Sequence, residues 1–85
     1  MFEMTEALMH HARFLILRMT SAEFHDIEWE LITAQNFAYK AGQSAGARQS
    51  STPGYLPAHL RKAYQEGYDD ARYEALCLGK ELNHV

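Results

Sequence analysis

Apolar residues recur at steps of three and four along almost the whole chain, while strand-like alternation and hairpin turn pairs do not occur. This pattern predicts an all-α protein with three helices. The longest uninterrupted apolar run covers residues 14–17, whereas a helix that spans a bilayer needs roughly 20 apolar residues. We therefore expect no transmembrane helix and no membrane partner.

The first predicted helix covers residues 1–19 and is amphipathic. Its apolar stripe consists of Leu8, Ala12, Leu15 and Met19, and the neighbouring Phe14, Ile16 and Leu17 widen it. A surface helix usually carries a narrower stripe. Either this helix packs centrally in the fold, or an exposed face that includes Phe14 and Leu17 binds a partner.

The second helix is predicted to begin at Thr20, because Thr20 and Glu23 match the capping box that satisfies free backbone N–H groups at a helix start. Its apolar seam alternates steps of three and four through Phe24, Ile27, Leu31, Ala34, Ala38, Ala41 and Ala45. The second half of this seam is alanine, and Gly42 and Gly46 lie beside it. Another helix can therefore approach closely only near the C-terminal end.

A connection follows at residues 49–57, which are rich in Ser, Thr, Gly and Pro. Pro57 suits the first turn of a third helix, which we expect to end near Gly79. The stripe of this helix is Leu60, Tyr64, Gly67, Ala71, Ala75 and Leu78. The small residues predict an antiparallel hairpin, residues 20–80, in which Gly67 and Ala71 pack tightly against Ala38, Gly42 and Ala45.

The chain has 85 residues, which is enough for a single small helical domain over residues 1–85. Its single cysteine, Cys77, cannot form an intramolecular disulfide and has no zinc-ligand spacing around it. The acidic N-terminal residues do not resemble a signal peptide. Together these features predict a cytoplasmic protein.

Sequence motifs for catalysis are missing: the chain contains no phosphate-binding glycine loop, no nucleophile elbow and no dinucleotide fingerprint. His10 and His11 are neighbours that point about 100° apart on a helix, so they do not form a metal-ligand pattern. Asp69 and Asp70 are typical of a solvated helix face. We expect no enzyme, no cofactor and no metal site.

The net negative charge lies in residues 1–36, which carry six acidic and two basic side chains, in a chain whose net charge is −3. Asp26, Glu28 and Glu30 surround the single Trp29, and an aromatic side chain in such a setting is typical of a protein interface. The predicted partner-binding residues are Asp26, Glu28, Trp29, Glu30, Phe14 and Leu17. In the alternative interpretation, Trp29 packs in the core.

Tyrosines and basic residues gather in the second half of the chain. Their combination suits either stacking on nucleic-acid bases or a protein interface, although the tyrosines could equally seal a small core. The alternative RNA-binding set is Arg48, Arg61, Lys62, Arg72, Tyr55 and Tyr68.

Several of these residues form a longer pattern within residues 37–75. Gly42, Ala45 and Gly46 follow an Ala-Tyr pair; then come a loop with Pro53 and Tyr55 and, finally, Arg61, Tyr64, Gly67, Tyr68 and Ala71 at fixed spacing. This stretch resembles the ribosome modulation factor family and its small phage and bacterial relatives. The resemblance implies a helical hairpin, binding to the small ribosomal subunit and its rRNA, promotion of inactive ribosome dimers and translational silencing.

Three functions follow as hypotheses. The preferred one is a non-enzymatic regulator, encoded by a phage or mobile element, that binds and inhibits or modulates a bacterial host protein. The second is a ribosome-associated hibernation factor. The third is a self-associating structural protein, in which the apolar surplus of the first helix forms a homodimer.

Overall fold

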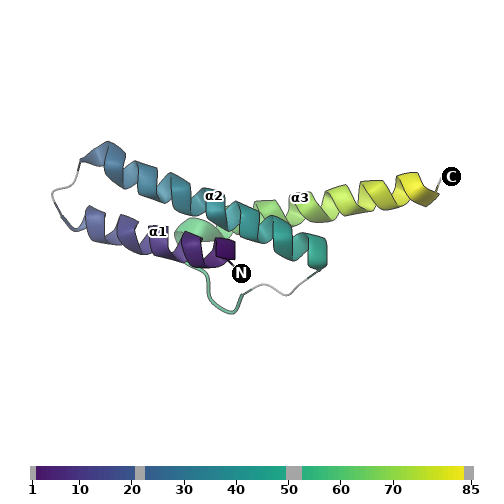
Figure 1. Cartoon of the computed structure of the whole chain (residues 1–85), viewed down its shortest axis with the longest axis horizontal. Helices are drawn as coiled ribbons and strands as arrows, with labels where there is room; N and C mark the ends of the chain where they lie inside the picture. The colour runs from purple at the N-terminus through teal and green to yellow at the C-terminus, as the bar shows by residue number, and fades with distance from the viewer. Residues whose placement is uncertain (1, 21–22, 50–52, 84–85) are drawn as a thin grey trace.

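The computed structural model describes residues 2–20, 23–49 and 53–83, and it describes side chains as far as residue 78. Three helices make up the fold: α1 (Phe2–Arg18), α2 (Phe24–Arg48) and α3 (Ala58–Asn83) (Figure 1). The all-α prediction is confirmed. α2 is the central helix, because both α1 and α3 pack against it.

The antiparallel hairpin of this protein is formed by α1 and α2. α1 runs back along α2, as Figure 1 shows. His10, near the middle of α1, donates a hydrogen bond to Glu30 over 2.6 Å and stacks on Phe37 with ring centroids 5.7 Å apart. These contacts fasten α1 along one side of α2.

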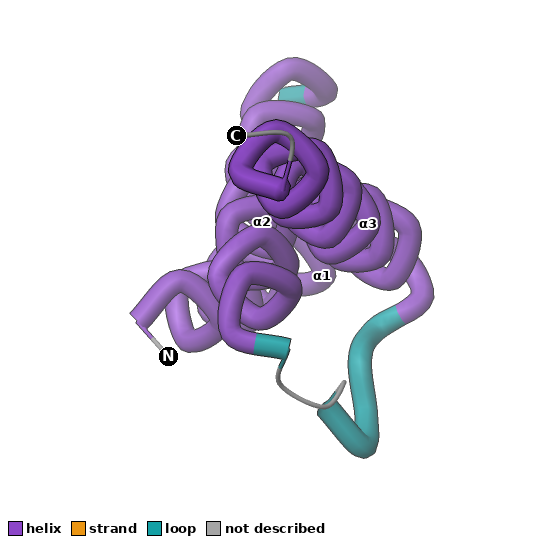
Figure 2. The backbone as a smooth tube through the Cα atoms, turned by 90° about the vertical axis from the view of Figure 1, so that its right-hand side faces the viewer, coloured by secondary structure: helices purple, strands orange, loops and turns teal. Residues whose placement is uncertain are grey.

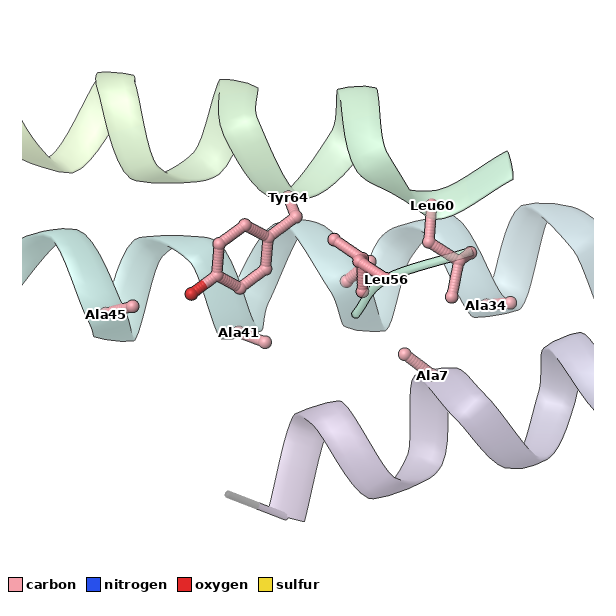
Figure 3. Close-up of a cluster of buried hydrophobic side chains, with 8 residues drawn as sticks. Ala7, Ala34, Ala41, Ala45, Leu56, Leu60 and Tyr64 are labelled. Carbon is pink, nitrogen blue, oxygen red and sulfur yellow. The ribbon is translucent and has the colours of Figure 1, made fainter. Parts of the chain in front are cut away.

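α2 and α3 run parallel, so the predicted antiparallel pairing of these two helices is wrong. Near the start of α3, the Gln35 side chain donates to the His59 carbonyl over 3.2 Å. Further along both helices, Gly46 lies against Tyr68 and Ala71. The contacts therefore advance in the same direction on the two helices, as the order of the labelled side chains in Figure 3 also shows.

The connection between α2 and α3 is long enough to permit this direction. Its nine residues can extend over roughly 30 Å, and the return from the end of α2 to the level of Gln35 requires about 20 Å. Figure 2 shows the described end of this connection, residues 53–57, beside the helices. Leu56, near its end, is buried and joins the core, so the return path is itself part of the packing.

Small residues allow α2 and α3 to touch through their backbones. A Cβ atom at Gly42 would collide with the Tyr64 carbonyl oxygen, and one at Gly67 would collide with the Tyr39 carbonyl oxygen. Gly46 and Ala71 lie in the same contact. The predicted packing role of these residues is confirmed, although in parallel rather than antiparallel helices.

The core is small because alanine supplies much of it. Leu60 has an exposed fraction of zero and is the largest fully buried side chain among the described residues. Around it lie buried side chains from all three helices and the connection: Ala7, Ala34, Ala38, Ala41, Ala45, Leu56 and Tyr64 (Figure 3).

The buried face of α1 differs from the predicted stripe. Ala7, His11 and Phe14 are buried, whereas Met19 is 87% exposed. Leu8, Ala12 and Leu15 are also exposed. The prediction counted apolar residues alone, but here the helix turns an aromatic His11 and Phe14 toward the start of α3, where both rings contact His59.

The predicted helix boundaries also need correction. The capping box does not form: Thr20 Oγ1 donates to the Leu17 carbonyl over 2.9 Å at the end of α1. α2 begins at Phe24, and its N-cap residue Glu23 makes no side-chain capping bond. α3 continues through Gly79 to Asn83, five residues beyond the predicted last stripe residue Leu78.

Candidate partner-binding face

One side of α2 remains open between α1 and α3. It carries a hollow of about 520 Å³, and every residue that lines the hollow belongs to α2. We call this surface the α2 outer face; its residues are His25, Glu28, Trp29, Ile32, Thr33, Asn36, Phe37 and Lys40. Their spacing of three and four residues places them together along one side of the helix.

Trp29 and Ile32 form the apolar centre of the α2 outer face. The exposed fraction is 59% for Trp29 and 47% for Ile32. The alternative that Trp29 packs in the core is therefore wrong. Two neighbouring exposed apolar side chains beside a hollow are typical of an interaction site.

The three carboxylates around Trp29 lie in different surroundings. Glu28 lines the hollow. Asp26 is exposed, with its carboxylate 3.5 Å from the His25 ring. Glu30 instead accepts the hydrogen bond from His10 and so helps to fix α1 on α2. The predicted acidic face is thus divided, and only Glu28 of the three lines the hollow.

The other end of the α2 outer face carries a positive charge. The Lys40 ammonium group lies 5.6 Å from the centroid of the Phe37 ring. Phe37 stacks in turn on His10 of α1, so its position depends on the α1–α2 contact. The face therefore has an acidic Glu28 at one end, apolar side chains in the middle and Lys40 at the other end.

Phe14 is buried, so the interpretation that it belongs to an exposed partner-binding face of the first helix is wrong. Its side chain is 5% exposed, its ring meets His59 edge-on, with centroids 5.1 Å apart, and the Arg18 guanidinium lies over it. Leu17 is half-buried. Neither Phe14 nor Leu17 lines the hollow beside Trp29, so the structure does not bring the three residues together in one surface.

The residues of the alternative RNA-binding set are spread along α3 and its connection. Arg61 donates to the Leu56 carbonyl and lines a small hollow with the exposed Tyr55. Arg72 lies about 16 Å further along the helix, and the intervening segment contains three acidic residues, Glu66, Asp69 and Asp70. Tyr68 is half-buried against Gly46, Lys62 is exposed beside Arg61, and Arg48 is exposed at the end of α2. These positive charges do not form one continuous patch.

Besides the His10–Glu30 and Gln35–His59 contacts, two further polar contacts join different helices, and neither was predicted from the sequence. His11 Nε2 and His59 Nδ1 are 3.2 Å apart, and burial, aided by the nearby His59 and Arg18, lowers the pKa of His11. The Tyr39 hydroxyl donates to Asp70, and this hydrogen bond raises the pKa of Tyr39 above its usual value. The partners are 48 positions apart in the first contact and 31 in the second, so spacing along the sequence could not pair them.

The described residues contain one grouping of three side chains that could hold a metal ion. Glu23, His25 and Asp26 gather at the start of α2, and all three are exposed. His25 lies 3.6 Å from the Glu23 carboxylate and 3.5 Å from the Asp26 carboxylate. These exposed ion pairs account for the arrangement without a metal.

Within the described part of the chain, no helix combines the length and apolar character that crossing a membrane requires. Comparison with family models finds no match, and searches among curated proteins and solved structures find no significant similarity. The resemblance of residues 37–75 to the ribosome modulation factor family therefore stays a prediction.

Proposed function

We propose that this chain is a non-enzymatic regulatory protein that binds a bacterial host protein through the α2 outer face. The observation that carries the proposal is the exposure of Trp29 beside Ile32 on the one open side of the central helix. Tryptophan is enriched among the residues that dominate binding energy at protein interfaces.

The chemistry of the α2 outer face suits an elongated protein segment better than a small polar ligand. The hollow is open and apolar at its centre, and a partner can cover Trp29 and Ile32 together. Glu28 and Lys40 then meet opposite charges at the two ends, which would fix the direction in which the partner lies. The exposed Asp26 extends the negative end.

Binding through this face is separable from folding. Trp29 and Ile32 lie outside the buried cluster that α2 shares with its neighbours. Truncating either side chain should leave the free energy of unfolding within about 0.5 kcal/mol of the wild-type value, as is usual for surface positions. A loss of binding in such a variant then reports on the interface.

Affinity purification from a bacterial lysate tests the proposal. The tagged wild-type protein should recover one host protein that survives nuclease treatment, identified by mass spectrometry. Trp29→Ala should lose most of it, since truncating a dominant interface residue costs about 2 kcal/mol or more, roughly 30-fold in affinity. The matched control is Phe24→Ala, another exposed aromatic of α2 that does not line the hollow.

Two outcomes would contradict the proposal. If Trp29→Ala recovers the host protein as well as the wild type does, the site lies elsewhere. If the wild type instead recovers small-subunit ribosomal proteins that disappear with nuclease or high salt, the ribosome-associated hypothesis replaces this one. Variants of Arg48, Arg61 and Arg72 would then locate that site.

A further inference from the structure

His11 and His59 form a contact between the first and third helices in which His11 is buried and His59 is exposed. His11 is 8% exposed, and its Nε2 atom faces His59 Nδ1 across 3.2 Å. The two ring centroids are 5.3 Å apart, and the Phe14 ring packs against both. Each helix also packs on α2, but here α1 and α3 meet directly.

Only certain protonation states permit this hydrogen bond. With both rings neutral, one facing nitrogen donates its proton and the other accepts it. A first added proton binds at a nitrogen on the far side of one ring, so the N–H···N bond survives. A second proton puts hydrogen atoms on both facing nitrogens, which removes the bond and sets two positive rings against each other. The hydrogen bond is therefore lost only when both rings carry a positive charge.

We propose that the His11–His59 pair is an acid-sensitive clasp that holds α1 against the start of α3 and releases it when both rings are protonated. The release would uncover Phe14 and the apolar face of α1 around Ala7. The clasp shares no residue with the α2 outer face.

The groups around the clasp favour release rather than retention at low pH. The titratable groups that face His11 are His59 on α3 and Arg18 on α1. Both disfavour a positive charge on His11. From α2, the neutral Gln35 donates to the His59 backbone carbonyl. Burial acts in the same direction and is the largest cause of the lowered pKa of His11.

The sign of the pH dependence follows from this lowered pKa. A histidine that takes up its proton less readily in the folded protein than in the unfolded chain stabilises the fold above the ordinary pKa of about 6.5. That stability is lost as the pH falls through and below this value.

Hydrogen exchange of the α1 backbone amides tests the clasp. After correction for intrinsic exchange rates, the amides around Ala7 and His11 should exchange about fivefold faster at pH 5 than at pH 7.5, which corresponds to the loss of one hydrogen bond. His11→Gln with His59→Asn is the decisive variant, because its amide groups replace Nε2 and Nδ1 without titrating. It should retain protection at both values of pH.

The matched control is His25→Gln, which removes an exposed histidine on α2 that makes no contact with the clasp. It should show the wild-type pH dependence. Equal exchange at the two pH values in the wild type would overturn the clasp, as would an unchanged acid response in the amide variant. Should the double variant lose protection at every pH, NMR titration of the His11 ring decides instead: a single step that is independent of His59 would overturn the clasp as well.

Discussion

Gly42 lies where the backbones of α2 and α3 touch. It carries no side chain toward Tyr64, so the Tyr64 carbonyl can occupy the space that a Cβ would fill. Gly54, in the connection between α2 and α3, has no neighbour within 4 Å of such a Cβ position. The two glycines thus have different roles although their residue type is the same.

Gly42→Ala should destabilise the protein by about 1–3 kcal/mol, because the added methyl group forces the helices apart. Gly54→Ala is the control and should be neutral or slightly stabilising, since Gly54 has no left-handed backbone and no crowding. Denaturant unfolding of both variants measures the difference. Equal stabilities would show that the helices do not approach as closely as described.

Residue types were sufficient to predict the close packing, but they left open whether Trp29 is exposed at an interface or packed in the core. Glycine and alanine at regular spacing have one strong physical use in a helix, the close approach of another helix, so Gly42, Gly46 and Gly67 could be assigned from the sequence. Trp29 could not, because α2 carries apolar residues on more than one side. Which side is buried depends on where α1 and α3 lie, and spacing within one helix does not contain that information.

At the scale of the elements, the end of α2 is set by Gln49. This residue has φ 56° and ψ 34°, a left-handed conformation that glycine adopts without strain, and its N–H donates to the Ala45 and Gly46 carbonyls. A side chain in this conformation costs about 1–2 kcal/mol. Sequence patterns placed the break here correctly but gave no reason for choosing glutamine.

Gln49→Gly should therefore stabilise the protein by about 1 kcal/mol, because it removes the cost of the left-handed side chain and retains the capping N–H. Arg48→Gly is the matched control: it adds the same flexibility inside the last helical turn and should destabilise by about 0.5–1 kcal/mol. Thermal or denaturant unfolding distinguishes the two. A destabilised Gln49→Gly would mean that α2 ends differently in solution.

At the scale of the whole molecule, the fold is elongated. Its extents are 59 × 25 × 19 Å, and its radius of gyration is 15.6 Å, compared with about 12 Å for a compact domain of this length. The accessible surface of 6143 Å² exceeds the ~5100 Å² expected for a monomer of this mass. This excess surface, which includes Trp29 and Ile32, is available to a partner.

The direction of α3 is the part of the topology that the sequence could not supply. Small residues pack on small residues in either direction, so Gly67 against α2 fits a parallel and an antiparallel pair alike. The nine-residue connection is compatible with both. The parallel arrangement depends on tertiary contacts of the returning chain, chiefly the burial of Leu56.

Cross-linking distinguishes the two directions. In a Cys77→Ala background, Gln35→Cys with Lys62→Cys should react with a short bismaleimide, because these residues line the same hollow. Gln35→Cys with Arg72→Cys should not react, since Arg72 lies about 20 Å further along the parallel pair. In an antiparallel hairpin the second pair would react and the first would not, and mass spectrometry would detect the reversal.

The proposal that the α2 outer face binds a partner is tested most directly by the fluorescence of Trp29, the single tryptophan of the chain. On titration with the captured host protein, or with a tryptophan-free version of it, the emission of Trp29 should shift to shorter wavelength, and its quenching by acrylamide should fall as the 59% exposed ring is covered. Emission and quenching that stay unchanged while a second method shows the complex forming would contradict the account.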